Sequence, residues 1–473
     1  MSATDHRIAV KDVRVDKGNM VHYTVEYGAR VGRFFSGSPF FVQYDRRIGL
    51  QDVPVGILTI PLLANLMPVA WAIGAEVRAE QLDRAFHDSL AEVRRAFGLL
   101  YPRIRFSGSL HVERLTAQLP AAEPARTAAF FSGGVDSLGT FLRRKEERPY
   151  FITVWGGDIG LHQPALWKEV RERNEAFGRS HGIESLFIRT GMRTFLNEET
   201  IAFRYGRFTQ GWWPGIQHGI GMVGLCAPLA YALGIGRLYV PSALPPGLAR
   251  SVPDGSNTLI NNRIRWAGAQ VQLEGEGLSR QDKVALVADY LRTRDTQLTV
   301  RVCWQHPAYG NCGRCEKCAR TMAALLAEGV DPRQAGFPFA QDSLDEIRRR
   351  LPAWLSSSAL RVAYWEEVRR RAIAAMAEDG GRIRAEDRPF FEWLGKQRLA
   401  NYGKRRTAGR RLLNLVPHPL FLYLKKMARR PRFKGTVGTI GTIGTIGTIG
   451  TIGAVGAVGD GGSAAASGTL GTE

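Results

Sequence analysis

The residues best suited to chemistry lie in one short loop between an apolar run and an amphipathic run. The loop consists of Ser132, Gly133, Gly134, Val135, Asp136 and Ser137. Adjacent glycines let a backbone turn sharply and approach an anion, and N–H groups at a helix start point toward it. The serines add hydroxyl donors, and Asp136 can cap helix amides or hold Mg²⁺. We therefore predict a phosphate-binding loop of these six residues, with Asp136 and Ser137 catalytic. The alternative is an ordinary strand-to-helix turn.

Four of the five cysteines fall between positions 303 and 318. Eight residues separate Cys303 from Cys312, and two residues separate Cys312 from Cys315 and Cys315 from Cys318. Thiolates at this spacing can close a tetrahedral shell around Zn²⁺. We predict a structural zinc site, with an iron–sulfur cluster or a redox pair as the alternatives. The fifth cysteine, Cys226, lies in an apolar segment and is expected in the core.

The elements that must position these motifs follow a regular rhythm after Thr127. Strands are expected at 128–131, 150–155, 185–188 and 238–240, with helices at about 136–146, 164–181 and 215–234 between them. A strand followed repeatedly by a crossover helix is typical of a doubly wound parallel sheet, which binds ligands outside the carboxyl ends of its strands. We therefore predict an α/β fold with the glycine loop at such an end.

Other parts of the chain surround this α/β domain, which is expected at 126–335 with both motifs. Residues 1–125 show alternating runs at 20–27 and 40–44 and a helical pattern at about 75–99, which predicts an α+β domain of unknown role. Helical patterns at 342–351 and 359–376 predict a helical, basic extension over 336–434. Residues 435–473 include eight glycine triplets without proline, so we expect a disordered low-complexity tail and not collagen.

The charge of the chain is unevenly distributed. The net charge is +20, and residues 396–434 hold five Lys and eight Arg with no acidic residue, whereas 15 basic and 13 acidic residues nearly cancel in 1–125. A basic segment weakly indicates a polyanionic partner, so nucleic-acid binding through 396–434 is a prediction that we do not favour. The apolar stretch 412–424 could dock on a membrane face or a partner, but Pro417 and Pro419 interrupt it.

Two uncharged stretches, 53–75 and 208–236, are long enough to suggest membrane spans. Their prolines, glycines and polar residues fit buried segments better, so no transmembrane span is expected. The polar start of the chain lacks the pattern of a signal peptide, which favours a cytoplasmic protein.

The string SGGVDS after a four-residue apolar strand resembles the PP-loop superfamily of ATP pyrophosphatases. It differs from a Walker loop because no Lys-Ser/Thr pair closes it. Together with CGRCEKC, and with PGIQHGIGMVGLCAPLAYALGIGRLYV and LSRQDKVALV between the two motifs, it resembles 7-cyano-7-deazaguanine synthase (QueC) over about 126–335. The additional regions are similar to those of larger homologues in bacterial antiphage systems.

This resemblance implies an ATP-dependent carbon–nitrogen ligase. A substrate carboxylate, 7-carboxy-7-deazaguanine or a related acid, would be adenylated, converted to an amide by ammonia, and dehydrated to a nitrile, as in queuosine biosynthesis. ATP would bind at Ser132, Gly133, Gly134, Asp136 and Ser137, and zinc at the four cysteines. In the antiphage type, the substrate or its acceptor would be a partner protein.

Several positions depart from the family pattern. Trp155 to His162 replaces a Tyr-Gly-Gln-x-His stretch, Ile216 and Gln217 replace Arg-Asn after Pro-Gly, and Arg280 stands where a lysine is expected. Asp158, His162 and Gln217 are therefore candidates for substrate contact. The bland alternatives are a helix cap for Asp158, a surface loop for His162 and a solvated side chain for Gln217.

Two other functions compete with the ligase. A tRNA-modifying sulfurtransferase also adenylates with a PP-loop, but phosphate-backbone binding calls for clustered Lys and Arg that 1–125 lacks. A non-catalytic nucleotide-binding component of a defence system is the other, although the complete loop argues against decay. Formation of AMP, and salt-dependent binding of tRNA, would separate the three.

Overall fold

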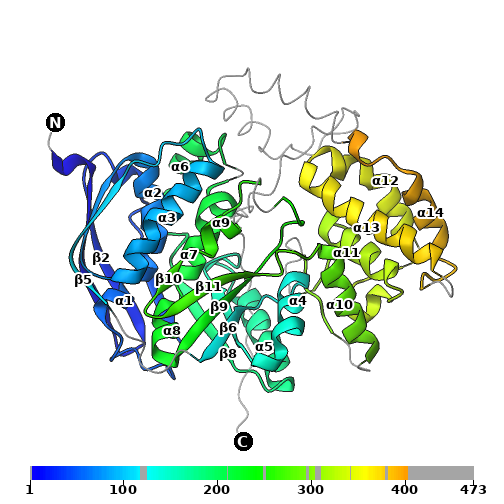
Figure 1. Ribbon diagram of the computed structural model, residues 1–473, viewed down its shortest axis with the longest axis horizontal. Helices are drawn as coiled ribbons and strands as arrows, with labels where there is room; N and C mark the ends of the chain where they lie inside the picture. The colour runs from blue at the N-terminus through cyan, green and yellow to red at the C-terminus, as the bar shows by residue number, and fades with distance from the viewer. Residues whose placement is uncertain are drawn as a thin grey trace, which may run out of the picture.

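The computed structural model describes residues 3–117, 125–209, 211–248, 252–293, 298–303, 310–340, 342–378 and 382–402. The basic segment beyond 402, the stretch 412–424 and the glycine triplets lie outside these ranges. The described chain is an α/β protein with one large, mostly parallel sheet and helices packed around it (Figure 1).

The sheet has eleven strands in the order β10-β11-β9-β6-β7-β8-β3-β2-β1-β4-β5. Their bounds are β1 Arg7–Val15, β2 Met20–Tyr27, β3 Phe41–Tyr44, β4 Glu76–Asp83, β5 Ser109–Thr116, β6 Arg126–Phe130, β7 Tyr150–Trp155, β8 Ser185–Thr190, β9 Ile235–Pro241, β10 Arg265–Trp266 and β11 Ala269–Glu274. The strands β11, β9, β6, β7 and β8 are parallel to their neighbours in this series.

The helices form one group around the sheet and a second group at one end of the molecule (Figure 1). The first, with the central helices, comprises α1 Val55–Leu58, α2 Ile60–Ile73, α3 Arg84–Leu100, α4 Val135–Arg144, α5 Pro164–Ser180, α6 Glu198–Tyr205, α7 His218–Gly224, α8 Ala227–Leu233 and α9 Thr258–Asn261. The second comprises α10 Arg280–Thr293, α11 Glu316–Ala327, α12 Ser343–Ser356, α13 Ala359–Ala377 and α14 Arg388–Lys396.

The strands of residues 1–125 continue the sheet of the predicted α/β domain. Antiparallel pairing of β3 with β8 joins them, with Val42 opposite Thr190 and Tyr44 opposite Ile188. The Tyr44 hydroxyl also donates to the carbonyl oxygen of Leu225, 2.8 Å away. The predicted boundary near 125 therefore falls within one sheet, and the two regions share a hydrophobic core.

The prediction of a helix at about 75–99 is wrong for the first third of that range, where the residues form strand β4. Val77 and Ala79 are buried while Arg78 and Glu80 are exposed, so the pattern there has a period of two. The helix α3 begins only after Asp83, whose carboxylate accepts a hydrogen bond from the Phe86 amide at 2.8 Å.

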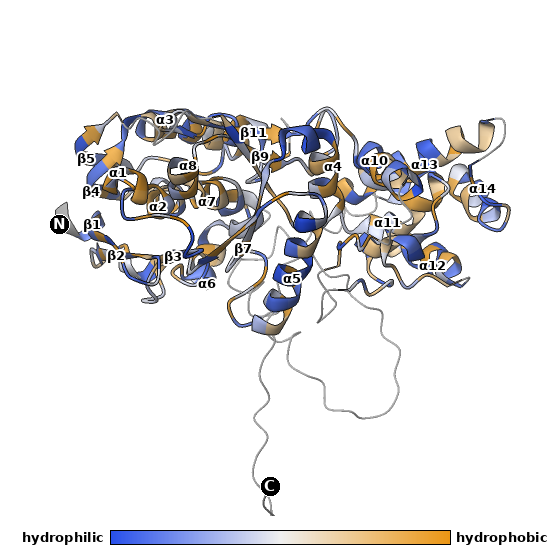
Figure 2. Cartoon of the chain, turned by 90° about the horizontal axis from the view of Figure 1, so that it is seen from below, coloured by the Kyte–Doolittle hydropathy of each residue, from blue (hydrophilic) through white to orange (hydrophobic). Residues whose placement is uncertain are grey.

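The apolar stretches at 53–75 and 208–236 both form core helices. Figure 2 shows the apolar helices α2, α7 and α8 close together at the end of the molecule opposite α10–α14. The stretch Trp213–Leu233, which a π-helical turn η4 (Trp213–Gln217) opens, is long and apolar enough to cross a membrane, but 72% of its most apolar window is buried inside the protein. Packing of α7 against α2 supplies that burial.

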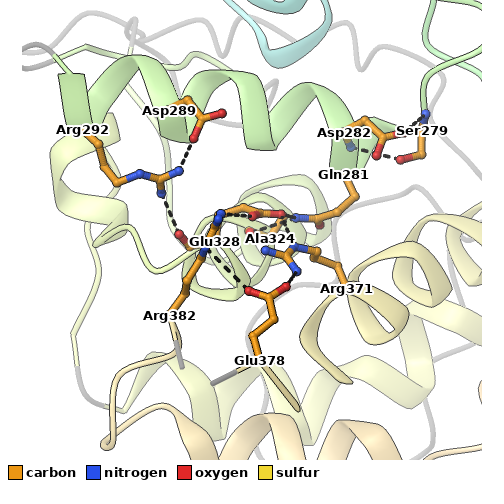
Figure 3. Close-up of polar contacts among 10 residues, drawn as sticks. All are labelled: Ser279, Gln281, Asp282, Asp289, Arg292, Ala324, Glu328, Arg371, Glu378 and Arg382. Carbon is orange, nitrogen blue, oxygen red and sulfur yellow. Dashed lines mark hydrogen bonds and ion pairs between the residues drawn. The ribbon is translucent and has the colours of Figure 1, made fainter. Parts of the chain in front are cut away.

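The second helical group is held together around the buried carboxylate of Glu328 (Figure 3). This residue follows α11 and accepts hydrogen bonds from Gln281 Nε2 of α10 at 2.8 Å and from Arg371 Nε of α13 at 2.9 Å. Its backbone carbonyl accepts from Arg292 at 2.8 Å. Glu328 thus joins α10 and α13 to the end of α11. In α10, Gln281 directly follows Arg280.

Replacing Glu328 with glutamine should lower the free energy of unfolding by about 2 kcal/mol, because the buried Arg371 pairing loses its counter-charge. Glu378→Gln is the matched control, since Glu378 contacts the same guanidinium at 2.7 Å but is 43% exposed. It should cost less, because solvent screens the exposed carboxylate of Glu378. Urea unfolding of both variants measures the difference, and equal losses would contradict this role of Glu328.

Candidate functional site

The glycine loop lies where the strand order reverses. The chain passes from β6 to β7 and β8 on one side, then returns to β9 and β11 on the other, so β6 lies between β7 and β9. Because these strands are parallel, the loop after β6, Asp158 after β7 and Ser242 after β9 share one edge of the sheet. A crevice outside the carboxyl ends at such a reversal is where doubly wound sheets bind ligands.

The backbone of the loop requires its glycines. Gly133 has φ of +72°, a left-handed conformation that favours glycine. A Cβ on Gly134 would lie 3.1 Å from the carbonyl oxygen of Arg301, and the Arg301 amide donates to the Gly133 carbonyl at 2.8 Å. The loop is thus held against the segment that leads to Cys303. Within the described chain, no side chain caps α4 at Gly134.

The two serines of the loop have different roles in the structure. Ser137 is buried, and its hydroxyl donates to the Gly134 carbonyl at 3.0 Å and accepts from the Ser132 amide at 3.3 Å. A hydroxyl has only one hydrogen to donate, so Ser137 mainly fixes the shape of the loop. Ser132 is exposed at the crevice, where its hydroxyl could meet a ligand.

Asp136 faces two cations and does not cap α4. Its Oδ2 lies 2.5 Å from a terminal guanidinium nitrogen of Arg280, and its Oδ1 lies 3.6 Å from Lys283 Nζ. Both cations come from α10, which packs against α4. A carboxylate with two cationic partners is a poor ligand for Mg²⁺, so the expected role of Asp136 in holding Mg²⁺ does not fit this geometry.

Burial and charge oppose each other at this ion pair. Burial alone would raise the pKa of the Asp136 carboxyl, but the charges of Arg280 and Lys283 outweigh it and hold the pKa below its usual value. Burial lowers the pKa of Lys283, whose side chain is 3% exposed, while Asp136 opposes that shift. Lys283 Nζ also donates to the carbonyl oxygen of Ser242, after β9. The charges are therefore fixed at the ends of β6 and β9.

A second layer of side chains orients Arg280. The ring of Tyr364, from α13, lies 4.7 Å from the Arg280 guanidinium and 4.3 Å from that of Arg320. The Tyr364 hydroxyl donates to the carbonyl of Ala243 at 2.7 Å, and Glu367 accepts from the Arg280 amide at 3.1 Å. The region predicted as an extension beyond 335 thus supplies walls of the site.

Sequence reasoning noted Arg280 but missed Lys283, Arg320 and Tyr364. A usable signal was present for Lys283, because it lies among the apolar positions of α10, beside Val284 and Val287, instead of on its polar face. A lysine on a buried helix face needs a partner or a function. Tyr364 had no such signal, since a tyrosine in an amphipathic helix is an ordinary core residue.

The three candidates for substrate contact have different environments. Asp158 is exposed after β7 and accepts from Trp213 Nε1 at 3.0 Å, so it caps no helix. His162 is exposed in the loop before α5. Gln217 is fully buried and donates to Asn65 Oδ1 at 2.9 Å and to the Met192 carbonyl at 2.6 Å, which corrects the solvated alternative. Only Asp158 and His162 are available to a ligand.

The four cysteines form one compact group that could hold a metal ion such as zinc. Their sulfur atoms all lie within 4.8 Å of one another, and three of the pairs are 3.4–3.9 Å apart. Four sulfurs about 2.3 Å from one central ion would be about 3.8 Å apart, which fits this set. Sulfur atoms around an iron–sulfur cluster must enclose its several atoms, so this spacing favours a single ion.

The cysteine group is continuous with the crevice. Cys318 belongs to α11 together with Glu316 and Arg320, which pair at 2.8 Å. Lys317 lies between Cys315 and Cys318 in the sequence, and burial lowers its pKa to about 8. The charge of Arg280 lowers this pKa further, whereas the charge of Asp158 opposes the shift. The hydrogen bond between the Cys315 and Cys318 sulfur atoms lowers the pKa of the Cys315 thiol to about 5. The remaining cysteine, Cys226, is buried in the core, as its sequence context predicted.

No protein-family model, curated protein or solved structure matches this chain.

Proposed function

We propose that the loop at 132–137 binds the phosphates of ATP and that the protein transfers AMP to a substrate carboxylate. The observation that carries this proposal is the fixed pair of cations, Arg280 and Lys283, beside a glycine loop at the reversal of a parallel sheet. Polyphosphate chemistry needs both features, namely backbone N–H groups for close contact and positive charges for the leaving group.

The proposed chemistry is nucleophilic substitution at the α-phosphorus. A carboxylate oxygen of the substrate forms a bond to phosphorus, the bond to the bridging oxygen breaks, and pyrophosphate leaves with that electron pair. The amides of Gly133 and Gly134 would orient the phosphates, and Arg280 with Lys283 would stabilise the charge that develops on pyrophosphate. Asp136 holds both cations in place before the nucleotide arrives.

The acid is proposed from the resemblance to 7-cyano-7-deazaguanine synthase. It would be 7-carboxy-7-deazaguanine or a related acid, with ammonia or a partner protein as the acceptor of the activated acyl group. Zinc at the four cysteines would hold the helices that carry Arg320 and Tyr364. It would take no part in the reaction.

The test is the identity of the nucleotide product. Purified protein given MgATP, 7-carboxy-7-deazaguanine and ammonium chloride should form AMP and pyrophosphate, and the acid alone should support exchange of labelled pyrophosphate into ATP. Thin-layer chromatography of ATP labelled at the α-phosphate measures the first, and charcoal binding of labelled ATP measures the second. ADP as the sole product, with no exchange, would contradict the proposal.

A further inference from the structure

A second set of polar side chains lies beside Asp158, which follows β7 at the same edge of the sheet as the glycine loop. His218, the first residue of α7, shares a hydrogen bond of 2.7 Å between its Nδ1 and Ser256 Oγ. Its Nε2 lies 3.9 Å from Asp158 Oδ2, and its side chain is 34% exposed. His218 was not singled out from the sequence, because it lies within a long apolar segment.

The backbone holds this histidine rigidly. A Cβ on Gly219, the next residue, would lie 1.7 Å from the carbonyl oxygen of Gly255, so the turn that carries Ser256 packs directly on the start of α7. The Gly255 amide donates to the Pro214 carbonyl at 2.9 Å, and the Asp254 carboxylate accepts from the Ser256 amide at 2.8 Å. Figure 1 shows α7 beside α9, which follows this turn.

Charged and aromatic side chains surround His218. Asp158 faces its Nε2, and the buried Asp254 lies close enough for the two to interact electrostatically. The indole of Trp213 packs edge-on against the imidazole with ring centres 5.1 Å apart. Lys317 interacts electrostatically with both Asp158 and Arg280.

We propose that His218 is the general base for the second half of the reaction, and this rests on the proposed function. An amine attacks the acyl carbon of the acyl-adenylate with its lone pair, the bond from that carbon to the phosphate oxygen breaks, and AMP leaves with the electron pair. The proton lost by the amine passes to His218 Nε2 and then to solvent. Ser256 fixes the orientation of the ring through Nδ1, so that Nε2 is turned toward Asp158.

The test separates the two halves of the reaction in His218→Asn. Asparagine can keep a hydrogen bond to Ser256 but has no basic nitrogen. Formation of the amide from 7-carboxy-7-deazaguanine, MgATP and ammonium chloride should fall by on the order of a hundredfold, the usual contribution of a general base. Pyrophosphate exchange should be retained, and hydroxylamine, a strong nucleophile that is largely unprotonated at neutral pH, should still form the hydroxamate. Ser256→Ala should show a smaller loss in the same direction.

The control is His22→Asn, since His22 is an exposed histidine of β2, on a strand separated from β7 by β3 and β8. It should change none of the three rates. If His218→Asn forms the amide at the wild-type rate, or loses exchange and transfer equally, the proposed role of His218 is wrong while AMP transfer stands. If the wild-type protein shows no exchange with this acid, the proposed function itself fails.

Discussion

Replacing Asp136 with asparagine is expected to slow AMP formation by on the order of a hundredfold, a typical cost of disturbing one preorganised charge at a reacting phosphate. Asparagine has the same shape but removes the negative charge that holds Arg280 and Lys283. Without it, two largely buried cations repel each other and move from the ends of β6 and β9. The same change should lower the free energy of unfolding by about 3 kcal/mol, because breaking a buried pair leaves its partners unpaired.

The matched control for this change lies on the same helix. Asp282 is exposed in the first turn of α10 and accepts from the Ser279 amide at 2.8 Å, so Asp282→Asn removes the same charge without touching the loop (Figure 3). It should cost about 1 kcal/mol as a weakened helix cap and leave AMP formation nearly unchanged. Steady-state rates and urea unfolding of both variants measure the contrast. A wild-type rate in Asp136→Asn would exclude this ion pair from the chemistry.

The local parts of the fold could be predicted from the sequence. The strands β6 to β9 are short apolar runs between helical patterns, and β2 and β7 have the predicted bounds, Met20–Tyr27 and Tyr150–Trp155. The strand β4 was missed because its alternation runs directly into the amphipathic pattern of α3. The edge strand β5 is exposed along much of its length, so it has no clear apolar signal.

The joining of the two regions could not be predicted, because it depends on a distant pairing. The strands β3 and β8 are far apart along the chain, and nothing in either one specifies the other. The same holds for the candidate site. The glycine loop and the four cysteines can be recognised from their spacing in the sequence. Arg280 and Asp136, by contrast, are 144 residues apart and meet only because α10 packs on α4. The cytoplasmic location and the basic segment's partner stay predictions.

Removal of the metal from the cysteine group should have the largest effect on stability. The group joins the segment before Cys303, which holds the glycine loop through Arg301, to helix α11. Cys318→Ala should therefore abolish the binding of one zinc ion per chain. It should also lower the free energy of unfolding by about 5 kcal/mol or more, because structural zinc commonly contributes more than that in small domains. Arg320, on the same helix, would then lose its position beside Tyr364, so AMP formation should also fail.

The control for the metal is Cys226, the buried cysteine outside the group of four. Cys226→Ala removes a thiol from the core between the sheet and α8 and should cost only about 1–2 kcal/mol, as a small cavity does. It should retain the metal. Elemental analysis by mass spectrometry and thermal unfolding with and without a chelator measure both effects.

One zinc per chain and a colourless protein are expected, because the sulfur atoms are too close together to enclose a cluster. Visible absorption with bound iron and acid-labile sulfide would show instead that these cysteines rearrange around an iron–sulfur cluster, and Cys318→Ala with full zinc content would exclude Cys318 as a ligand.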